Sequence, residues 1–162
     1  MSKQHYQVST YTARTSVGYL IKRANSLMLD VMEPVLEERG YSFLQYVILS
    51  SLREGIAVNP KDICFQFRHN SGALTRVIDQ LAERGLLERT RGGRDRRTVE
   101  LQLTRAGIEA AESLIPLVVG KLNLALADFS SGEVQEFLRL LIKLNTTLQS
   151  AVEPGVAAGT AA

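Results

Sequence analysis

Five arginines crowd into nine consecutive positions, from Arg89 to Arg97, with Asp95 as the one acidic residue among them. Guanidinium groups form charge-assisted hydrogen bonds with phosphate oxygens, so this density favours a polyanionic partner. The stretch 60–105 holds 10 Lys and Arg against 6 Asp and Glu, while the rest of the chain holds 9 against 11. The whole-chain charge of +2 therefore hides a basic centre.

The composition excludes several other classes of protein. A chain of 162 residues, 45% hydrophobic and 22% charged, suits one globular domain with a sizeable core. Cys64 is the only cysteine, and neither a signal peptide nor an apolar run of ~18 residues is visible, so we expect a cytoplasmic protein with no membrane contact. His5 and His69 are too scattered for a metal site. With no catalytic constellation visible, we expect neither an enzyme nor a cofactor.

Several elements are expected to position the arginines, and the first of them are helices. Apolar residues recur at helical spacing between 17 and 35, and Gly40 is placed to end that helix. Ser42 and Gln45 fit a capping box that opens a second helix. Asn59 and Pro60 are typical of the start of a short third helix.

The fourth helix and a hairpin complete the basic centre. Asn70 can cap a helix that runs to about Arg84, and Gly85 can stop it. The period then changes to two, which predicts strands over 86–91 and 98–103. Beyond the hairpin, Thr104 can cap a fifth helix, and a further capping box joins Ser130 to Glu133 before a sixth. The order predicts a mainly α fold with a small β-hairpin wing, a winged helix-turn-helix flanked by long helices.

Two motifs in this order carry a family resemblance. The segment GALTRVIDQLAERGLLER at 72–89 resembles the recognition helix and first wing strand of the MarR family of transcriptional regulators. The residues DRR at 95–97 and LTRAG at 103–107 resemble the family's D-x-R wing and the start of its next helix. The resemblance covers roughly residues 15 to 150. It implies a sequence-specific DNA-binding homodimer, and in many relatives ligand pockets between the dimerisation and DNA-binding parts.

The family's architecture implies a division of this chain. The expected parts are an N-terminal arm (1–14), an N-terminal dimerisation helix (15–40), a winged helix DNA-binding domain (41–104), C-terminal dimerisation helices (105–152) and a disordered tail (153–162). Two recognition helices would enter successive major grooves of a pseudo-palindromic operator in double-stranded DNA, ~34 Å apart. The apolar stripes of the first, fifth and sixth helices could each be core, but a helical dimer interface accounts for all three together.

The expected DNA-binding residues come from the recognition helix, the turn before it, its supporting helix and the wing. They are Lys61, Arg68, His69, Asn70, Ser71, Gly72, Thr75, Arg76, Arg91, Arg94, Arg96 and Arg97. A helix fits the major groove, where base edges are distinguishable, and a basic hairpin can reach the minor groove or phosphates. Asp95 is expected to shape the wing.

For several of these residues a second interpretation is open. Arg76 either contacts DNA or pairs with Asp79 or Gln80, and Arg97 either contacts DNA or partners Asp95. The tip arginines could form a solvated turn, Asn70 is first of all a helix cap, and the turn at 68–69 could be merely polar.

Cys64 and the aromatic side chains could each have a functional role or could serve only to pack the core. Cys64 is expected to be a buried, inert thiol rather than a redox sensor. The aromatic residues near the expected junction could line a ligand pocket, but core is the favoured reading; they are Tyr11, Tyr19, Tyr41, Phe43 and Tyr46.

The sequence predicts a MarR-type repressor that a small-molecule effector releases. The alternative is a winged-helix protein-interaction module without specific DNA binding. The small side chains of Gly72 and Ala73 at the start of the recognition helix allow it, and the arginine-rich wing argues against it.

Overall fold

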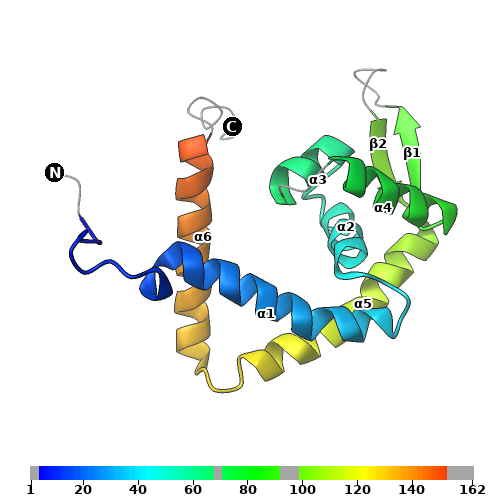
Figure 1. Cartoon of the computed structure of the whole chain (residues 1–162). Helices are drawn as coiled ribbons and strands as arrows, with labels where there is room; N and C mark the ends of the chain where they lie inside the picture. The colour runs from blue at the N-terminus through cyan, green and yellow to red at the C-terminus, as the bar shows by residue number, and fades with distance from the viewer. Residues whose placement is uncertain (1–3, 68–70, 92–98, 153–162) are drawn as a thin grey trace. The chain divides into compact units, whose positions relative to one another are not determined.

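The computed structural model describes residues 4–67, 71–91 and 99–152, without the side chains of residues 66, 67, 71 and 91. Its elements are η1 (Ala13–Thr15), α1 (Val17–Glu37), α2 (Phe43–Arg53), α3 (Pro60–Phe67), α4 (Ser71–Glu83), β1 (Leu87–Arg91), β2 (Val99–Leu103), α5 (Arg105–Ala125) and α6 (Ser131–Val152). The mainly helical chain with one antiparallel hairpin confirms the predicted fold class (Figure 1). The chain divides into two compact units, 1–121 and 122–162, with α5 running from one into the other.

The core of the first unit joins α2, α3, α4, the hairpin and the start of α5. Its largest members are fully buried aliphatic side chains, each contributing ~1.5–3 kcal/mol of transfer free energy. They are Ile48, Leu49, Ile63, Leu74, Ile78, Leu81 and Leu87. Because α2 and α3 both pack against α4, this core fixes the central helix of the winged fold.

The helix starts follow the caps expected from the sequence. The predicted capping box is present, because Ser42 Oγ accepts the Gln45 N–H at 3.2 Å and Gln45 Oε1 accepts the Ser42 N–H at 3.1 Å. At the third helix, Asn59 Oδ1 accepts the Asp62 N–H at 3.0 Å. Each bond satisfies an amide that the helix itself leaves without a partner.

The turn after α4 sets where the hairpin begins. Gly85 takes a φ of 69°, and the N–H groups of Gly85 and Leu86 bond back to Ala82 and Leu81. This is the glycine-terminated helix end in which the last carbonyls are satisfied. Since the Leu86 amide closes the helix, β1 starts at Leu87, one residue later than predicted. It pairs with β2 in the register Leu87↔Leu103.

Two expectations about packing are wrong: not all of the five aromatic side chains lie in the core, and Cys64 is not fully buried. Tyr11 and Tyr19 are 54% and 42% exposed, so they are not core residues. They lie on the N-terminal arm and in the first turn of α1, where the described residues leave both side chains exposed. The other three aromatics and Cys64 are only half-buried. Cys64 lies at the edge of α3, where it helps to line a hollow of about 440 Å³ beside α4.

The second unit contains α6. Its predicted capping box is present, because Ser130 N donates to Glu133 Oε2 at 2.9 Å and Ser130 Oγ accepts the Glu133 N–H at 3.3 Å. The Ser130 N–H and the Ser130 hydroxyl, which donates to the same Oε2 at 2.7 Å, both favour the carboxylate and hold the pKa of Glu133 below its ordinary value. Among the described residues α6 buries none, although Phe137, Leu138 and Ile142 project from it.

Candidate nucleic-acid interface

Helix α4 has one buried face and one open face. Leu74, Ile78 and Leu81 are fully buried against α2 and α3. Thr75 and Arg76 are exposed. A helix held by its apolar stripe, with polar side chains on the opposite side, can enter a groove of DNA without unfolding its own core.

Arg76 is available to an external partner. Its side chain has no hydrogen-bond or ion-pair partner among the described residues. Both of the residues that the sequence offered as partners are engaged elsewhere, because Asp79 pairs with Arg89 of β1 and Gln80 Oε1 accepts from Gln45. The ion-pair reading of Arg76 is therefore wrong. An unpaired guanidinium on the open face of α4 favours a contact with an anion or a base edge.

The supporting helix places a second cation nearby in the fold. Lys61 lies exposed in the first turn of α3, and Asp62 in the same turn accepts the Val58 N–H at 3.0 Å. Lys61 and Thr75 line the same hollow between α3 and α4. The structure thus brings the lysine and the open face of α4 together.

Many of the predicted DNA-binding residues lie outside the described part. Those with no described position are Arg68, His69, Asn70, Arg94, Asp95, Arg96 and Arg97. Ser71 opens α4 and Arg91 ends β1, but their side chains are not described. Gly72 is described and exposed in the first turn of α4. What the structure does fix is the strand that leads to the wing, since Arg91 pairs with Val99 across the hairpin.

A latch at the root of the wing joins the hairpin to α5. Thr104 N donates to Leu86 O at 3.1 Å, and Thr104 Oγ1 donates to Gly85 O at 2.7 Å. The same hydroxyl accepts the Gly107 N–H at 3.0 Å, which confirms Thr104 as the cap of α5. Gly107 lies against the Leu86 carbonyl with no room for a Cβ atom. One threonine therefore fixes both the end of β2 and the start of α5 against the α4–β1 turn.

A polar junction at the same, C-terminal end of α4 was not foreseen from the sequence. Arg84 donates to Gly40 O at 3.0 Å, and its guanidinium lies 4.3 Å from the centre of the Tyr41 ring. Gln45 Nε2 donates to Gln80 Oε1 at 3.3 Å. These contacts span 35 to 44 positions, so helical periodicity carries no signal for them; only the capping role of Gln45 was visible.

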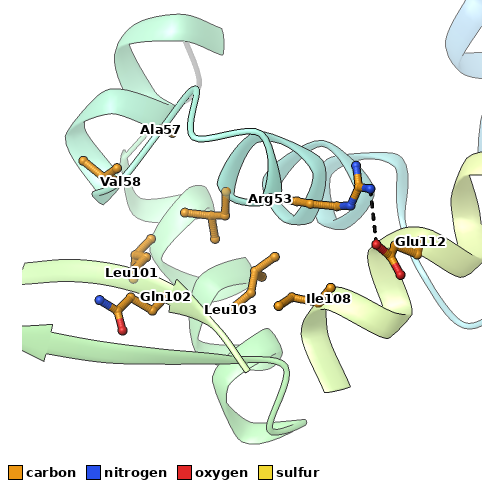
Figure 2. A pocket seen from close by; sticks show the side chains of 9 residues that line it. Arg53, Ala57, Val58, Leu101, Gln102, Leu103, Ile108 and Glu112 are labelled. Carbon is orange, nitrogen blue, oxygen red and sulfur yellow. Dashed lines mark hydrogen bonds and ion pairs between the residues drawn. The ribbon is translucent and has the colours of Figure 1, made fainter. Parts of the chain in front are cut away.

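A hollow of about 670 Å³ lies where α2, β2 and α5 meet (Figure 2). Leu101, Leu103 and Ile108 form its apolar side. At its rim Arg53 Nη2 and Glu112 Oε1 are 3.2 Å apart, and both side chains are partly exposed. The hollow adjoins the latch at Thr104, so an occupant would contact the root of the wing.

Within the described ranges two further features are absent. No group of three or more His, Cys, Asp or Glu side chains is placed to hold a metal ion. No helix there combines the length and the apolar character that crossing a bilayer requires.

Comparisons with known proteins agree with this geometry. The model of the MarR family matches residues 42–99. The transcriptional repressor MprA of Escherichia coli K12 is 25% identical over 139 residues, 85% of this chain and 79% of that protein. The multiple antibiotic resistance protein MarR of the same strain is 27% identical over 127 residues, 78% of this chain and 88% of that protein. These relatives are transcriptional regulators.

A solved structure shows such a fold on DNA. A mutant MarR from Escherichia coli, complexed with operator DNA, is 26% identical to this chain and superposes with a TM-score of 0.68. The match covers 79% of this chain and 92% of the other.

Proposed function

Because this chain belongs to the MarR family of DNA-binding transcriptional regulators, we propose that it acts as a homodimeric repressor in the cytoplasm. The dimer binds a pseudo-palindromic operator, and a small molecule releases it from this DNA. Helix α4 acts as the recognition helix in the major groove, and the hairpin acts as the wing. The repressor role is supported by the names of the relatives, several of which are repressors.

The observation that carries the proposal is the open face of α4. Arg76 stands exposed on this face with no partner among the described residues, while the buried face fixes the helix against α2 and α3. In our proposal Arg76 and Thr75 contact DNA directly and Lys61 contacts a phosphate. The remaining DNA contacts come from the other predicted residues: Arg68, His69, Asn70, Ser71, Gly72, Arg91, Arg94, Arg96 and Arg97. Asp95 shapes the wing.

Dimerisation is supported by apolar side chains that each of the two units, taken by itself, leaves exposed. On α1, Leu20 and Leu27 are 50% and 52% exposed, and on α6, Leu138 and Ile142 are 52% and 65% exposed. Exposed apolar surface of this extent marks an interaction site in a protein that remains in solution. Sedimentation should give twice the chain mass of 17.9 kDa. A single-chain mass at micromolar concentration would refute the homodimer.

The release of DNA by a small molecule is supported by the hollow at the wing root. An apolar body can lie on Leu103 and Ile108, and a carboxylate can compete with Glu112 for Arg53. An exposed ion pair contributes only ~0–1 kcal/mol, so opening it costs little. Apolar monocarboxylates that weaken operator binding should therefore lose their effect in Ile108→Trp, which fills the hollow. An undiminished effect in this variant would exclude the hollow as the effector site.

The test of DNA binding begins by selecting duplexes that the protein binds, because the operator sequence is not known in advance. The purified full chain is offered a random duplex library, and affinities for the selected duplex are measured at several salt concentrations. Arg76→Met should weaken binding to the selected duplex by about tenfold or more, the size of one base or phosphate contact. Arg39→Met is the matched control, because Arg39 is exposed and its side chain also has no described partner. If no duplex is enriched, or if the two variants behave alike, the proposal fails.

A further inference from the structure

The C-terminal end of α4 is attached to the turn between α1 and α2 through one arginine. Arg84 follows the last residue of α4, and its N–H still bonds to Gln80 O at 3.1 Å. Its guanidinium donates to Gly40 O at 3.0 Å and to Gln45 Oε1 at 3.4 Å, and stacks 4.3 Å from the Tyr41 ring centre. Both hydrogen bonds come from one nitrogen, Nη1, while the planar group lies over the ring; an ammonium group could donate to the two oxygens but would lose the planar stacking.

Gln45 joins this arginine to the start of α2. Its Oε1 accepts both from the Ser42 N–H, as part of the capping box, and from Arg84. Its Nε2 reaches Gln80 on α4 at 3.3 Å. The side chain is 9% exposed, so the amide is largely removed from water and its partners cannot be replaced by solvent at no cost. The first turn of α2 and the last turn of α4 thus share one buried amide.

The turn is in addition bonded to α1. Glu33 Oε2 of α1 accepts the Phe43 N–H at 2.9 Å, at the first residue of α2. The Tyr41 N–H bonds to Leu36 O of α1 at 3.0 Å. A continuous set of hydrogen bonds therefore runs from α1 through the turn to the end of α4.

These contacts concentrate on one half of α4. Its second half is held at Asp79 by Arg89 of the wing strand, and at Gln80 and Arg84 by the α1–α2 turn. Its first half carries Thr75 and Arg76 on the open face. The buried stripe holds α4 along its length, but its polar anchors are at the C-terminal end, while exposed side chains of its first half are open to a ligand.

From this arrangement we infer that Arg84 is a positioning residue for operator recognition: it sets the direction of α4 relative to α1 without touching DNA. The inference rests on the proposed function, in which α4 reads the operator and α1 carries part of the dimer interface. Through Arg84, the pairing of two chains determines where each recognition helix points.

The length of α4 makes the anchor important. Its 13 residues span about 20 Å at 1.5 Å per residue. A rotation of about 5° at the anchored end would move the first turn by nearly 2 Å. Donor–acceptor distances in hydrogen bonds vary by only about 0.5 Å, so such a shift breaks base contacts while leaving long-range attraction to phosphates intact.

The decisive experiment compares Arg84→Gln with Arg39→Gln in the full chain. The control removes the same charge from the α1–α2 turn that Arg84 contacts, and the side chain of Arg39 has no described partner to lose. The measured quantity is the affinity for the selected duplex divided by that for a random duplex. We expect Arg84→Gln to lower this ratio by about 2- to 30-fold, the range found for coupling residues. The random-duplex affinity and the salt slope should stay equal to those of the control.

Two results would overturn the inference. An unchanged ratio in Arg84→Gln would show that the anchor does not direct α4. A fall of the salt slope by about one relative to Arg39→Gln would show that Arg84 itself contacts a phosphate. If the unmodified chain prefers no duplex, the proposed function fails first; if it discriminates and Arg84→Gln discriminates equally, only this inference fails.

A second set of variants separates positioning from loss of folding. Tyr41→Leu removes the stacking partner and should lower the ratio as well, and the double variant should lose less than the product of the two single effects. Arg84→Lys, which keeps the charge, should recover only part of the ratio. All three variants should keep the far-ultraviolet circular dichroism of the unmodified chain. Multiplicative effects of the two substitutions would refute the pairing.

Discussion

Gly107 is the position where one added methyl group tests the wing root most directly. It lies in the first turn of α5, and a Cβ atom there would overlap the Leu86 carbonyl oxygen, lying 2.9 Å from its carbonyl carbon and 3.3 Å from Leu103 Cδ2. Two of these three neighbours are backbone atoms that cannot rotate away. Gly107→Ala must therefore push α5 from the α4–β1 turn, which stretches the bonds from Thr104 to Leu86 O and Gly85 O.

The magnitude follows from the terms that change. Overpacking of a close contact costs ~1–3 kcal/mol, and losing the two bonds of Thr104 costs ~1 kcal/mol each. Against these losses, replacing glycine by alanine within a helix stabilises the folded state by ~1 kcal/mol. The net loss is about 2–4 kcal/mol. For a chain of this size each kcal/mol shifts Tm by about 2–4 °C, so we expect Tm to fall by about 5–15 °C.

The control for this variant is the same substitution in the same helix. Gly120→Ala in α5 meets no atom of the chain within 4 Å, so it should gain helix propensity and raise Tm by about 2–4 °C. Thermal unfolding is followed by circular dichroism at one protein concentration, because association makes Tm concentration-dependent. A Gly107→Ala variant as stable as the unmodified chain would refute the close approach of α5 to the turn.

Three further outcomes follow from the described contacts. Asp79→Asn frees the exposed Arg89 from its partner, so Arg89 should become available to a phosphate and the salt slope of duplex binding should steepen by about one; an unchanged slope would show that the freed Arg89 contacts no phosphate. Tyr6→Phe removes the hydroxyl that accepts the first amide of α1 at 2.9 Å; that amide should exchange faster with solvent, and equal rates would show that the arm does not cap α1. Ser130→Ala removes the hydroxyl that donates to Glu133 Oε2, so the pKa of Glu133 should rise towards its ordinary value in a side-chain NMR titration, and an unshifted titration would contradict the cap. Because the folded pKa is lowered, the cap stabilises the start of α6 at a pH above the unfolded pKa, and this stabilisation is lost as the pH falls through the folded pKa.

Local physical rules explain what the sequence could predict. The capping boxes at Ser42 and Ser130, the cap at Thr104 and the glycine turn at Gly85 are all set by residues within four positions of one another. Period-3.6 and period-2 patterns separate the helices from the hairpin for the same reason. The order of these elements led to the winged helix-turn-helix.

Contacts between distant segments could not be predicted in this way. Asp79 forms its ion pair with Arg89 rather than with Arg76, because β1 runs back beside α4 after the turn. Arg84 meets Tyr41 across 43 positions, and no periodicity encodes that distance. The exposure of Tyr11 and Tyr19 could not be predicted either. Aromatic residues are usually buried, and composition does not say which faces of a helix the rest of the chain leaves uncovered.

The hairpin has a consequence for colloidal behaviour. The amide of Leu101 donates to Val58 O at 2.8 Å, so β2 is engaged on both sides, by β1 and by the segment before α3. Only β1 is left with an outer edge that has no strand neighbour among the described residues. That edge is five residues long and carries Glu88 and Arg89, and short charged edges resist the addition of foreign strands. The described strands of the hairpin are thereby protected against joining other sheets into aggregates.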